Sequence, residues 1–290
     1  MGIEQRLHLY STRADRYDRL RIFGKFEKMI DVKQIITEKN LSLPNFLINW
    51  LKKIIHQSEI NYFLKKNSGK IGVDFMSAIL NDFNIKTKIS GLDNIAHGEK
   101  LIFASNHPLG ALEAMAIGTV LGEQFYNKIN FVTNDLLTFL EPLKPIFTPV
   151  SVGVGKQNKM LAEDLDKTFS SDNQIIMFPS GTVSRRIRGK VQDPEWKKMF
   201  VAKARQYERN VVPIFCMGRS SNFFLNLSNF RKFIGIKTNI ELLFLPNEMF
   251  KKKNSEICIT IGKPISYKTF TKEKSDFEWA QEVRKKVYLL

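Results

Sequence analysis

The chain of 290 residues is 43% apolar, which is enough for one large or two small domains with a buried core. Its 45 lysines and arginines outnumber its 29 acidic residues, and the net charge of +16 predicts a polyanionic partner such as nucleic acid, an anionic membrane or an acidic protein. Two cysteines exclude a disulfide framework and a cysteine-based metal site, which fits a cytosolic setting. No apolar run reaches the roughly 18 residues of a membrane span, so any membrane contact is expected to be peripheral.

The N-terminal part differs in pattern from the rest of the chain. Helical patterns cover residues 29–39 and 43–57, and we expect residues 1–70 to form a helical segment that is a candidate for membrane-surface contact. The remaining residues, 71–290, are expected to form a separate α/β domain. The boundary falls near residues 67–70, where the apolar pattern is interrupted by polar residues and a glycine.

Residues 43–57 are predicted to form an amphipathic helix. Ser42 is a residue that can cap a helix, and Pro44 suits its first turn. Its apolar stripe has two interpretations. The helix either packs against the core, or lies in a membrane interface with Phe46 and Trp50 among lipid headgroups and lysines facing anionic lipid.

Beyond residue 72 the pattern alternates between helices and strands. Apolar runs of strand length are Ile85–Ile89, Leu101–Ser105, Ile129–Thr133, Ile146–Val150, Gln174–Phe178, Val211–Phe215, Ile240–Leu245 and Ile257–Ile261. Helical patterns cover Val73–Phe83, Ala111–Gly122, Asn158–Phe169, Pro194–Glu208, Asn222–Phe233 and the last fifteen residues. The alternation predicts an α/β fold with a mixed, largely parallel sheet flanked by helices.

One strand-to-helix junction carries the strongest catalytic signal. Of the four histidines, only His107 lies at such a junction, and the following Pro108 should keep it extended and outside the helix. Glu113 comes six residues later, so the two side chains can meet only if His107 folds back over the first helical turn. There the carboxylate would hold the imidazole with one nitrogen free to take a proton. The helix N-terminus after Gly110 offers N–H groups to an oxyanion.

A second segment combines small hydroxyl residues with arginines. A buried strand ends at a proline, and a glycine-containing turn and a basic cluster follow. This pattern suits the binding of an anionic group, and its polar side chains are Ser180, Ser184, Arg185, Arg186 and Arg188. The alternative is a solvated, charged loop. Ser180 lacks the glycine-flanked elbow of a nucleophilic serine.

Three blocks together resemble the glycerolipid acyltransferase superfamily, over roughly residues 75–265. Its signatures are an N-H-x4-D block, an F-P-E-G-T block and a later V-P strand. In the same order, this sequence has NHPLGALEA, FPSGTVSRR and VVPIF. The acid is a glutamate six residues after His107, Ser180 replaces the signature glutamate, and residues 147–152 lack an arginine. With these departures, the sequence resembles the hemolysin-like subgroup of the superfamily. That subgroup includes O-acyltransferases that complete bacterial ornithine and glycine aminolipids.

This resemblance implies a mechanism. His107 would remove the proton of an acceptor hydroxyl, which attacks an acyl thioester of acyl carrier protein or coenzyme A, while Glu113 orients the imidazole. The implied backbone donors to the oxyanion are Gly110, Ala111, Gly181 and Thr182. The implied binding residues for acceptor or acyl donor are Asn106, Ser180, Ser184, Arg185, Arg186 and Arg188. No covalent intermediate, bound cofactor or metal is expected.

The missing arginine favours an acceptor without a phosphate monoester. A monoacylated glycine or ornithine lipid offers a carboxylate that an arginine of the basic cluster could pair. The alternatives are a lysophosphatidate acyltransferase and a basic membrane- or nucleic-acid-binding protein without catalysis. Because no nucleic-acid-binding motif is present, the expected partners are the lipid acceptor, acyl carrier protein and the anionic cytoplasmic face of the inner membrane, where the protein would be peripheral.

Overall fold

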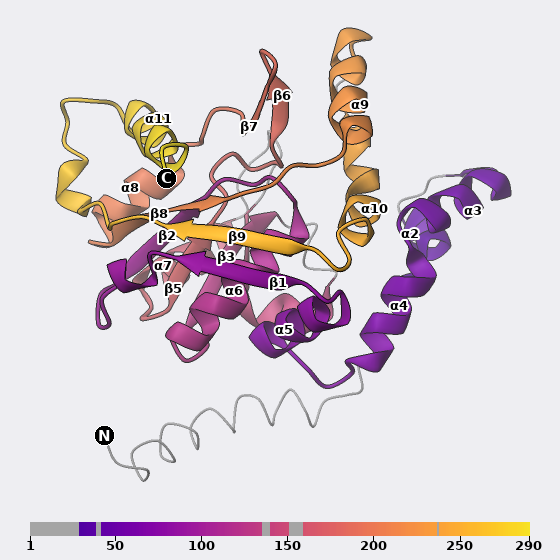
Figure 1. The fold of residues 1–290 in the computed structure, drawn as a ribbon, viewed down its shortest axis with the longest axis horizontal. Coiled ribbons are helices and arrows are strands. Elements are labelled where there is room, and N and C mark those ends of the chain that lie inside the picture. The colour runs from indigo at the N-terminus through magenta and orange to yellow at the C-terminus, as the bar shows by residue number, and fades with distance from the viewer. Residues whose placement is uncertain (1–28, 39–41, 135–139, 151–158, 237) are drawn as a thin grey trace.

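The central element is a seven-stranded sheet with helices on both faces (Figure 1). The structure, a computed structural model, describes residues 29–38, 42–134, 140–150, 159–236 and 238–290, so residues 1–28 and the predicted helix start at Asn158 lie outside it. In sheet order the strands are β1 (Lys86–Ser90), β9 (Glu256–Ile261), β8 (Asn210–Cys216), β2 (Leu101–Ser105), β5 (Gln174–Met177), β3 (Ile129–Asn134) and β4 (Phe147–Val150). Neighbours pair in parallel except β8 and β9, which confirms the predicted mixed, largely parallel sheet.

The middle of the sheet is apolar on both faces, as expected for strands covered on both sides. Along β2, Leu101 and Phe103 belong to one buried cluster, whereas Ile102 and Ala104 belong to another on the opposite face. The first cluster is covered by α5 (Gly72–Asp82) and α6 (Ala111–Gln124). The second is covered by α7 (Lys159–Ser170), α8 (Met199–Gln206) and α11 (Asp276–Val287).

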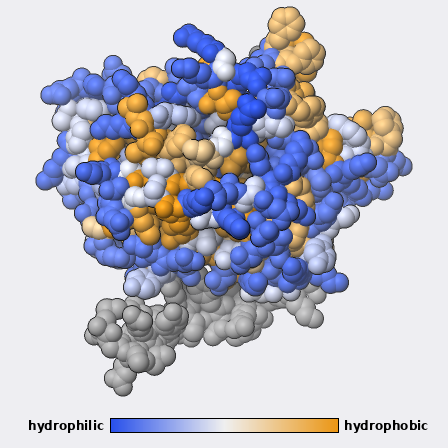
Figure 2. Space-filling view, viewed as in Figure 1, coloured by the Kyte–Doolittle hydropathy of each residue, from blue (hydrophilic) through white to orange (hydrophobic). Residues whose placement is uncertain are grey.

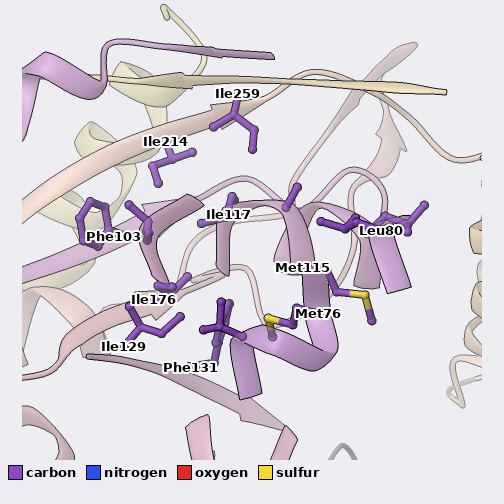
Figure 3. Close-up of a cluster of buried hydrophobic side chains, with 14 of the residues drawn as sticks. Met76, Leu80, Phe103, Met115, Ile117, Ile129, Phe131, Ile176, Ile214 and Ile259 are labelled. Carbon is purple, nitrogen blue, oxygen red and sulfur yellow. The ribbon is translucent and has the colours of Figure 1, made fainter. Parts of the chain in front are cut away.

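The cluster beneath α5 and α6 fixes the helix that carries the predicted catalytic acid. Figure 3 shows Met76 of α5 and Ile117 of α6 gathered with the strand residues Phe103 and Phe131. All four side chains are almost fully buried. Burying this much apolar surface holds α6 firmly on the sheet, so the first turn of α6 stays fixed relative to the end of β2.

The N-terminal helices depart from the prediction at a break. The expected helices over residues 29–39 and 43–57 are present as α2 (Val32–Glu38) and α3 (Asn45–Ile54), and a further helix that was not predicted, α4 (Gln57–Lys66), follows α3. His56 separates them because its φ of 54° is left-handed, and its ring stacks on Phe250 at 4.2 Å. The N-cap of α3 is Pro44 with no side-chain capping bond, so the expected cap by Ser42 is wrong.

The predicted strand over Ile240–Leu245 is also wrong. These residues form the 3-10 helix η4 (Ile240–Phe244), which continues into α10 (Leu245–Phe250). Pro246 occupies the first turn of α10, where the missing N–H of proline costs nothing. The Glu241 side chain points inward and pairs with two arginines. The apolar pattern of the sequence does not show that this acid is buried.

The basic cluster is more ordered than a loop. It forms a hairpin of β6 (Arg185–Ile187) and β7 (Lys190–Gln192), and both turn residues between them have positive φ, as a tight hairpin requires. After the hairpin, α8 begins at Met199 instead of the predicted Pro194. The predicted helix α9 (Asn222–Phe233) is confirmed. Among the residues that the structure describes, no helix combines the length and apolar character needed to cross a bilayer.

Candidate active site

Asn106 fastens the loop between β2 and α6 to the end of β8. Its side-chain amide donates to the carbonyl of Cys216 at 2.9 Å, and its Oδ1 accepts from the Cys216 N–H at 2.7 Å. Because both polar ends of this buried side chain are used inside the protein, the expected contact of Asn106 with a substrate is corrected to a structural role. Burial also raises the pKa of the Cys216 thiol well above its usual range, which keeps this nearby sulfur protonated.

The imidazole of His107 meets the carboxylate of Glu113. The distance from Nδ1 to Oε1 is 2.8 Å, so His107 does fold back over the first turn of α6, as the spacing requires. The same Oε1 accepts the backbone N–H groups of Leu109 and Gly110, at 3.0 and 2.9 Å. An ionised carboxylate only accepts hydrogen bonds, so Nδ1 carries the ring proton and Nε2 is left with a lone pair.

The environment of the pair is asymmetric. The Glu113 side chain is fully buried, whereas that of His107 is partly exposed. The ring of Phe178 stacks on the imidazole at 4.2 Å with an interplanar angle of 24°, which holds the ring plane. One face of the His107 ring is therefore covered by Phe178, its Nδ1 is occupied by Glu113, and part of the side chain stays open to solvent.

Asp193 holds the backbone of His107, and the sequence interpretation missed it. Its Oδ1 accepts the His107 N–H at 3.1 Å and the Ser184 hydroxyl at 2.6 Å, and its Oδ2 accepts the Trp196 indole N–H at 2.9 Å. The carbonyl of His107 accepts from the Ser184 N–H at 2.7 Å. In the sequence, Asp193 is an acid in a predicted connection, and only the tryptophan three residues later marks that connection as buried.

Residues at the end of the C-terminal helix bond to the backbone of Asp193. The Tyr288 hydroxyl accepts the Asp193 N–H at 2.7 Å, and an Arg284 guanidinium nitrogen donates to the Asp193 carbonyl at 2.5 Å. Burial raises the pKa of Tyr288 to about 12, so its hydroxyl stays protonated. The site therefore depends on contacts between segments far apart in the chain.

The expected backbone donors to an oxyanion are only partly open. Gly110 N–H is bonded to Glu113, and Gly181 N–H donates to the Phe178 carbonyl at 2.9 Å. This corrects the expectation that both glycines are available. Ala111 is exposed at the first position of α6, where the N–H has no acceptor within the helix, so it is the better-placed candidate. Thr182 N–H makes one long bond of 3.5 Å, to Ser180 Oγ.

Ser180, Ser184 and Arg185, which the sequence predicted to bind substrate, are hydrogen-bonded to other groups of the protein. Ser180 Oγ donates to the Thr182 carbonyl at 2.6 Å, and Ser184 is bonded to Asp193. Arg185 is only 3% exposed and donates to Glu241 Oε1 at 3.0 Å. Burial lowers the pKa of Arg185, although Glu241 opposes that shift. These contacts correct the expectation that Ser180, Ser184 and Arg185 face a substrate.

Glu241 is the centre of a buried cluster that the sequence interpretation did not find. Besides Arg185, its carboxylate pairs with Arg231 Nε of α9 at 2.9 Å. Of the other predicted cations, Arg186 reaches Asn222 and Asn226 of α9 at 2.8 and 2.6 Å, and Arg188 is exposed at the hairpin turn. No group of three or more potential metal-binding side chains occurs in the part of the chain that the structure describes.

A histidine that a carboxylate holds at the carboxyl end of β2, just before α6, is suited to act as a general base. The model of the acyltransferase family matches residues 34–290, and the chain belongs to this family. The family membership confirms the resemblance expected from the three sequence blocks. As an acyltransferase, the protein is an enzyme that transfers acyl groups other than amino-acyl groups.

Similar proteins include two from other bacteria. Proteins named Lyso-glycine lipid O-acyltransferase, from Phocaeicola vulgatus and Bacteroides thetaiotaomicron, are each 42% identical over 266 residues. These matches cover 90% of this chain and 95% and 97% of the relatives. A crystal structure of the 1-acyl-sn-glycerophosphate acyltransferase PlsC from Thermotoga maritima aligns with a TM-score of 0.45 and 16% identity, over 88% of this chain and 85% of that one.

Proposed function

We propose that the protein completes a glycine lipid by transferring a fatty acyl group from an acyl thioester to the hydroxyl of the monoacylated, lyso form. The observation that carries this proposal is the 2.8 Å contact of His107 Nδ1 with Glu113, which leaves Nε2 as a base. The names of the two relatives support the choice of acceptor. Transfer to lysophosphatidate is the competing activity.

The geometry supports the following reaction. Nε2 of His107 takes the proton of the acceptor hydroxyl as its oxygen attacks the thioester carbonyl carbon, and a tetrahedral oxyanion forms. The exposed first turn of α6, where Ala111 N–H is located, is placed to stabilise that oxyanion. Collapse breaks the carbon–sulfur bond, and the imidazolium returns its proton to the leaving thiolate. Glu113 stabilises the imidazolium throughout and needs no change of protonation.

Charge supports the proposed substrates. With Arg185 bound to Glu241, the cations left for the carboxylate of a glycine lipid are Arg186 and Arg188. A basic protein of net charge +16 suits an acidic acyl carrier protein as donor, and acyl-coenzyme A offers comparable anionic groups. The same charge favours a peripheral position on the anionic cytoplasmic face of the inner membrane.

Purified protein tests the proposal directly. Mixed with either acyl thioester, it should acylate a monoacylated glycine lipid and leave lysophosphatidate unchanged, as measured by mass spectrometry of the products. His107→Ala should lose about 10²–10⁴-fold in turnover while keeping the melting temperature, because it removes the general base. His97→Ala is the matched control, since His97 contacts Gln124 away from this site. Acylation of lysophosphatidate alone, or full activity of His107→Ala, would reject the proposal.

A further inference from the structure

Helix α9 carries large apolar side chains into solvent. Phe230 and Phe233 are 58% and 88% exposed, and the following Ile234 is also exposed. In Figure 1, α9 rises from the body of the molecule on the side where α3 also lies. Figure 2 shows hydrophobic side chains at the free end of α9 and again at the end of the N-terminal helices. Exposed rings of this size in neighbouring elements indicate an interaction surface.

Ring contacts link Phe223 of α9 and Trp50 of α3 through the half-buried Phe244. Phe230, seven residues after Phe223, lies on the same face of α9, and Phe233 lies one turn beyond Phe230. Phe223 of α9 lies 5.1 Å from Phe244 of η4, and Trp50 of α3 lies 6.1 Å from the same ring, both as centroid distances. Phe46, one turn before Trp50, is 70% exposed. The aromatic docking surface therefore consists of Phe46, Trp50, Phe223, Phe230, Phe233 and Phe244.

The segments that carry this surface are predominantly basic. Residues 42–57 contain lysines and no acidic residue. Residues 217–253 contain two acids, Glu241 and Glu248, and both are buried in contact with basic side chains. The exposed charges there belong to lysines and an arginine, such as Lys232. Beside α3, the exposed carboxylates of Asp31 and Glu59 are paired with Lys52 and His56. Exposed aromatic rings in these predominantly basic segments match a bilayer surface with anionic headgroups.

The surface borders the catalytic loop. Ser220, just before α9, donates its hydroxyl to the Pro108 carbonyl at 3.3 Å. A side chain placed on Gly110 would meet Leu245 of α10 at 3.5 Å. The elements that present the exposed rings therefore also touch the loop that holds His107.

We propose that the aromatic docking surface inserts its rings into the headgroup zone of an anionic membrane and holds the His107 site against that membrane. This inference rests on the proposed function in one respect, because a monoacylated lipid acceptor would then enter the site from the bilayer. Helix α9 is the main anchor, and α3 is the second. An acidic carrier protein would pair with the lysines but would leave a ring as exposed as Phe233 in water.

Vesicle sedimentation without substrates tests the surface independently of the reaction. The vesicles are phosphatidylcholine with about 30% phosphatidylglycerol, which supplies the anionic surface. The double variant Phe230→Ser, Phe233→Ser should bind about tenfold or more weakly, because it removes two rings that would leave water. The control is Phe277→Ser, which changes a phenylalanine on α11 that is 41% exposed and lies outside the aromatic docking surface, and this variant should bind as wild type. Circular dichroism and melting temperature should be unchanged in both variants, since exposed rings add little to the fold.

Turnover provides the second measurement. The double variant should keep wild-type turnover on an acceptor with a short, water-soluble acyl chain and lose turnover on the same headgroup presented in vesicles. Equal vesicle binding by the double variant and wild type would overturn the inference. Wild-type vesicle binding with impaired binding of acyl carrier protein would also overturn it and assign the surface to that protein. Absence of glycine-lipid acylation would reject the proposed function without changing the vesicle result.

Discussion

His107 is fixed by its backbone as well as by its ring. Glu113 and Phe178 determine the orientation of the imidazole, whereas Asp193 and Ser184 bond to the backbone N–H and carbonyl of the same residue. A general base must lie within hydrogen-bond reach of the proton that it removes, so a small displacement of the backbone lowers the rate. Asp193 is thus a positioning residue: it acts through His107 and has no contact with the substrate in the mechanism above.

Replacing Asp193 tests this role. Asp193→Ala removes the acceptor for three donors, from His107, Ser184 and Trp196, and should lower kcat by about 10–100-fold with KM nearly unchanged, because the base shifts while substrate-binding groups remain. Asp193→Asn keeps one side-chain oxygen as acceptor and should recover part of kcat. Steady-state kinetics and thermal melting distinguish the cases. A fall in melting temperature with unchanged kcat at a temperature where the variant is folded would contradict a positioning role.

The contact between His107 and Glu113 could be predicted from the sequence, whereas the buried acids that hold the surrounding residues could not. His107 and Glu113 are six residues apart, and the proline between them encodes the bend that brings them together. Asp193 lies 86 residues from His107, and Glu241 lies 56 residues from Arg185. No local sequence pattern indicates that Asp193 or Glu241 is buried. The prediction therefore assigned Arg185 to a substrate because its buried partner lay in a segment interpreted as a strand.

At the scale of elements, the contact between α5 and α6 sets where the catalytic acid lies. Gly118 of α6 faces this contact, and a Cβ added there would lie 2.6 Å from Met76 Sδ and 2.9 Å from Phe131 Cζ. Both distances are shorter than van der Waals contact, so the helices can approach only because residue 118 has no side chain. Sequence periodicity predicted both helices but not how closely they pack, because a glycine adds no signal to an apolar stripe.

Gly118→Ala should destabilise the protein in spite of a better helix propensity. In an exposed helix the change would stabilise by about 1 kcal/mol, whereas overpacking a core costs about 1–3 kcal/mol. The free energy of unfolding, measured with urea, should fall. Glu123→Ala, at an exposed position of the same helix, should change it by less than about 0.5 kcal/mol. A gain in stability for Gly118→Ala would mean that α5 and α6 are further apart than the structure places them.

At the scale of the whole molecule, the net positive charge and the aromatic docking surface have different effects on membrane binding. In the proposed membrane binding, the net charge of +16 would attract the protein to anionic lipid over several ångströms, but screened charges do not select which face meets the lipid. The exposed rings of α9 and α3 make that selection, since apolar insertion is local and insensitive to screening. In the proposed membrane binding, charge therefore supplies the attraction, and the aromatic docking surface sets the orientation.

Salt should separate these two contributions. Raising ionic strength from about 0.01 M to 0.15 M shortens the Debye length from about 30 Å to 8 Å, so binding to anionic vesicles should weaken for wild type and for Phe230→Ser, Phe233→Ser alike. At the higher salt the wild type should retain binding through its rings, whereas the double variant should approach its level on phosphatidylcholine vesicles without anionic lipid. Sedimentation across a salt series measures both curves. Curves that converge at high salt would show that the rings add nothing to the electrostatic attraction, and the orientation argued for α9 would then be wrong.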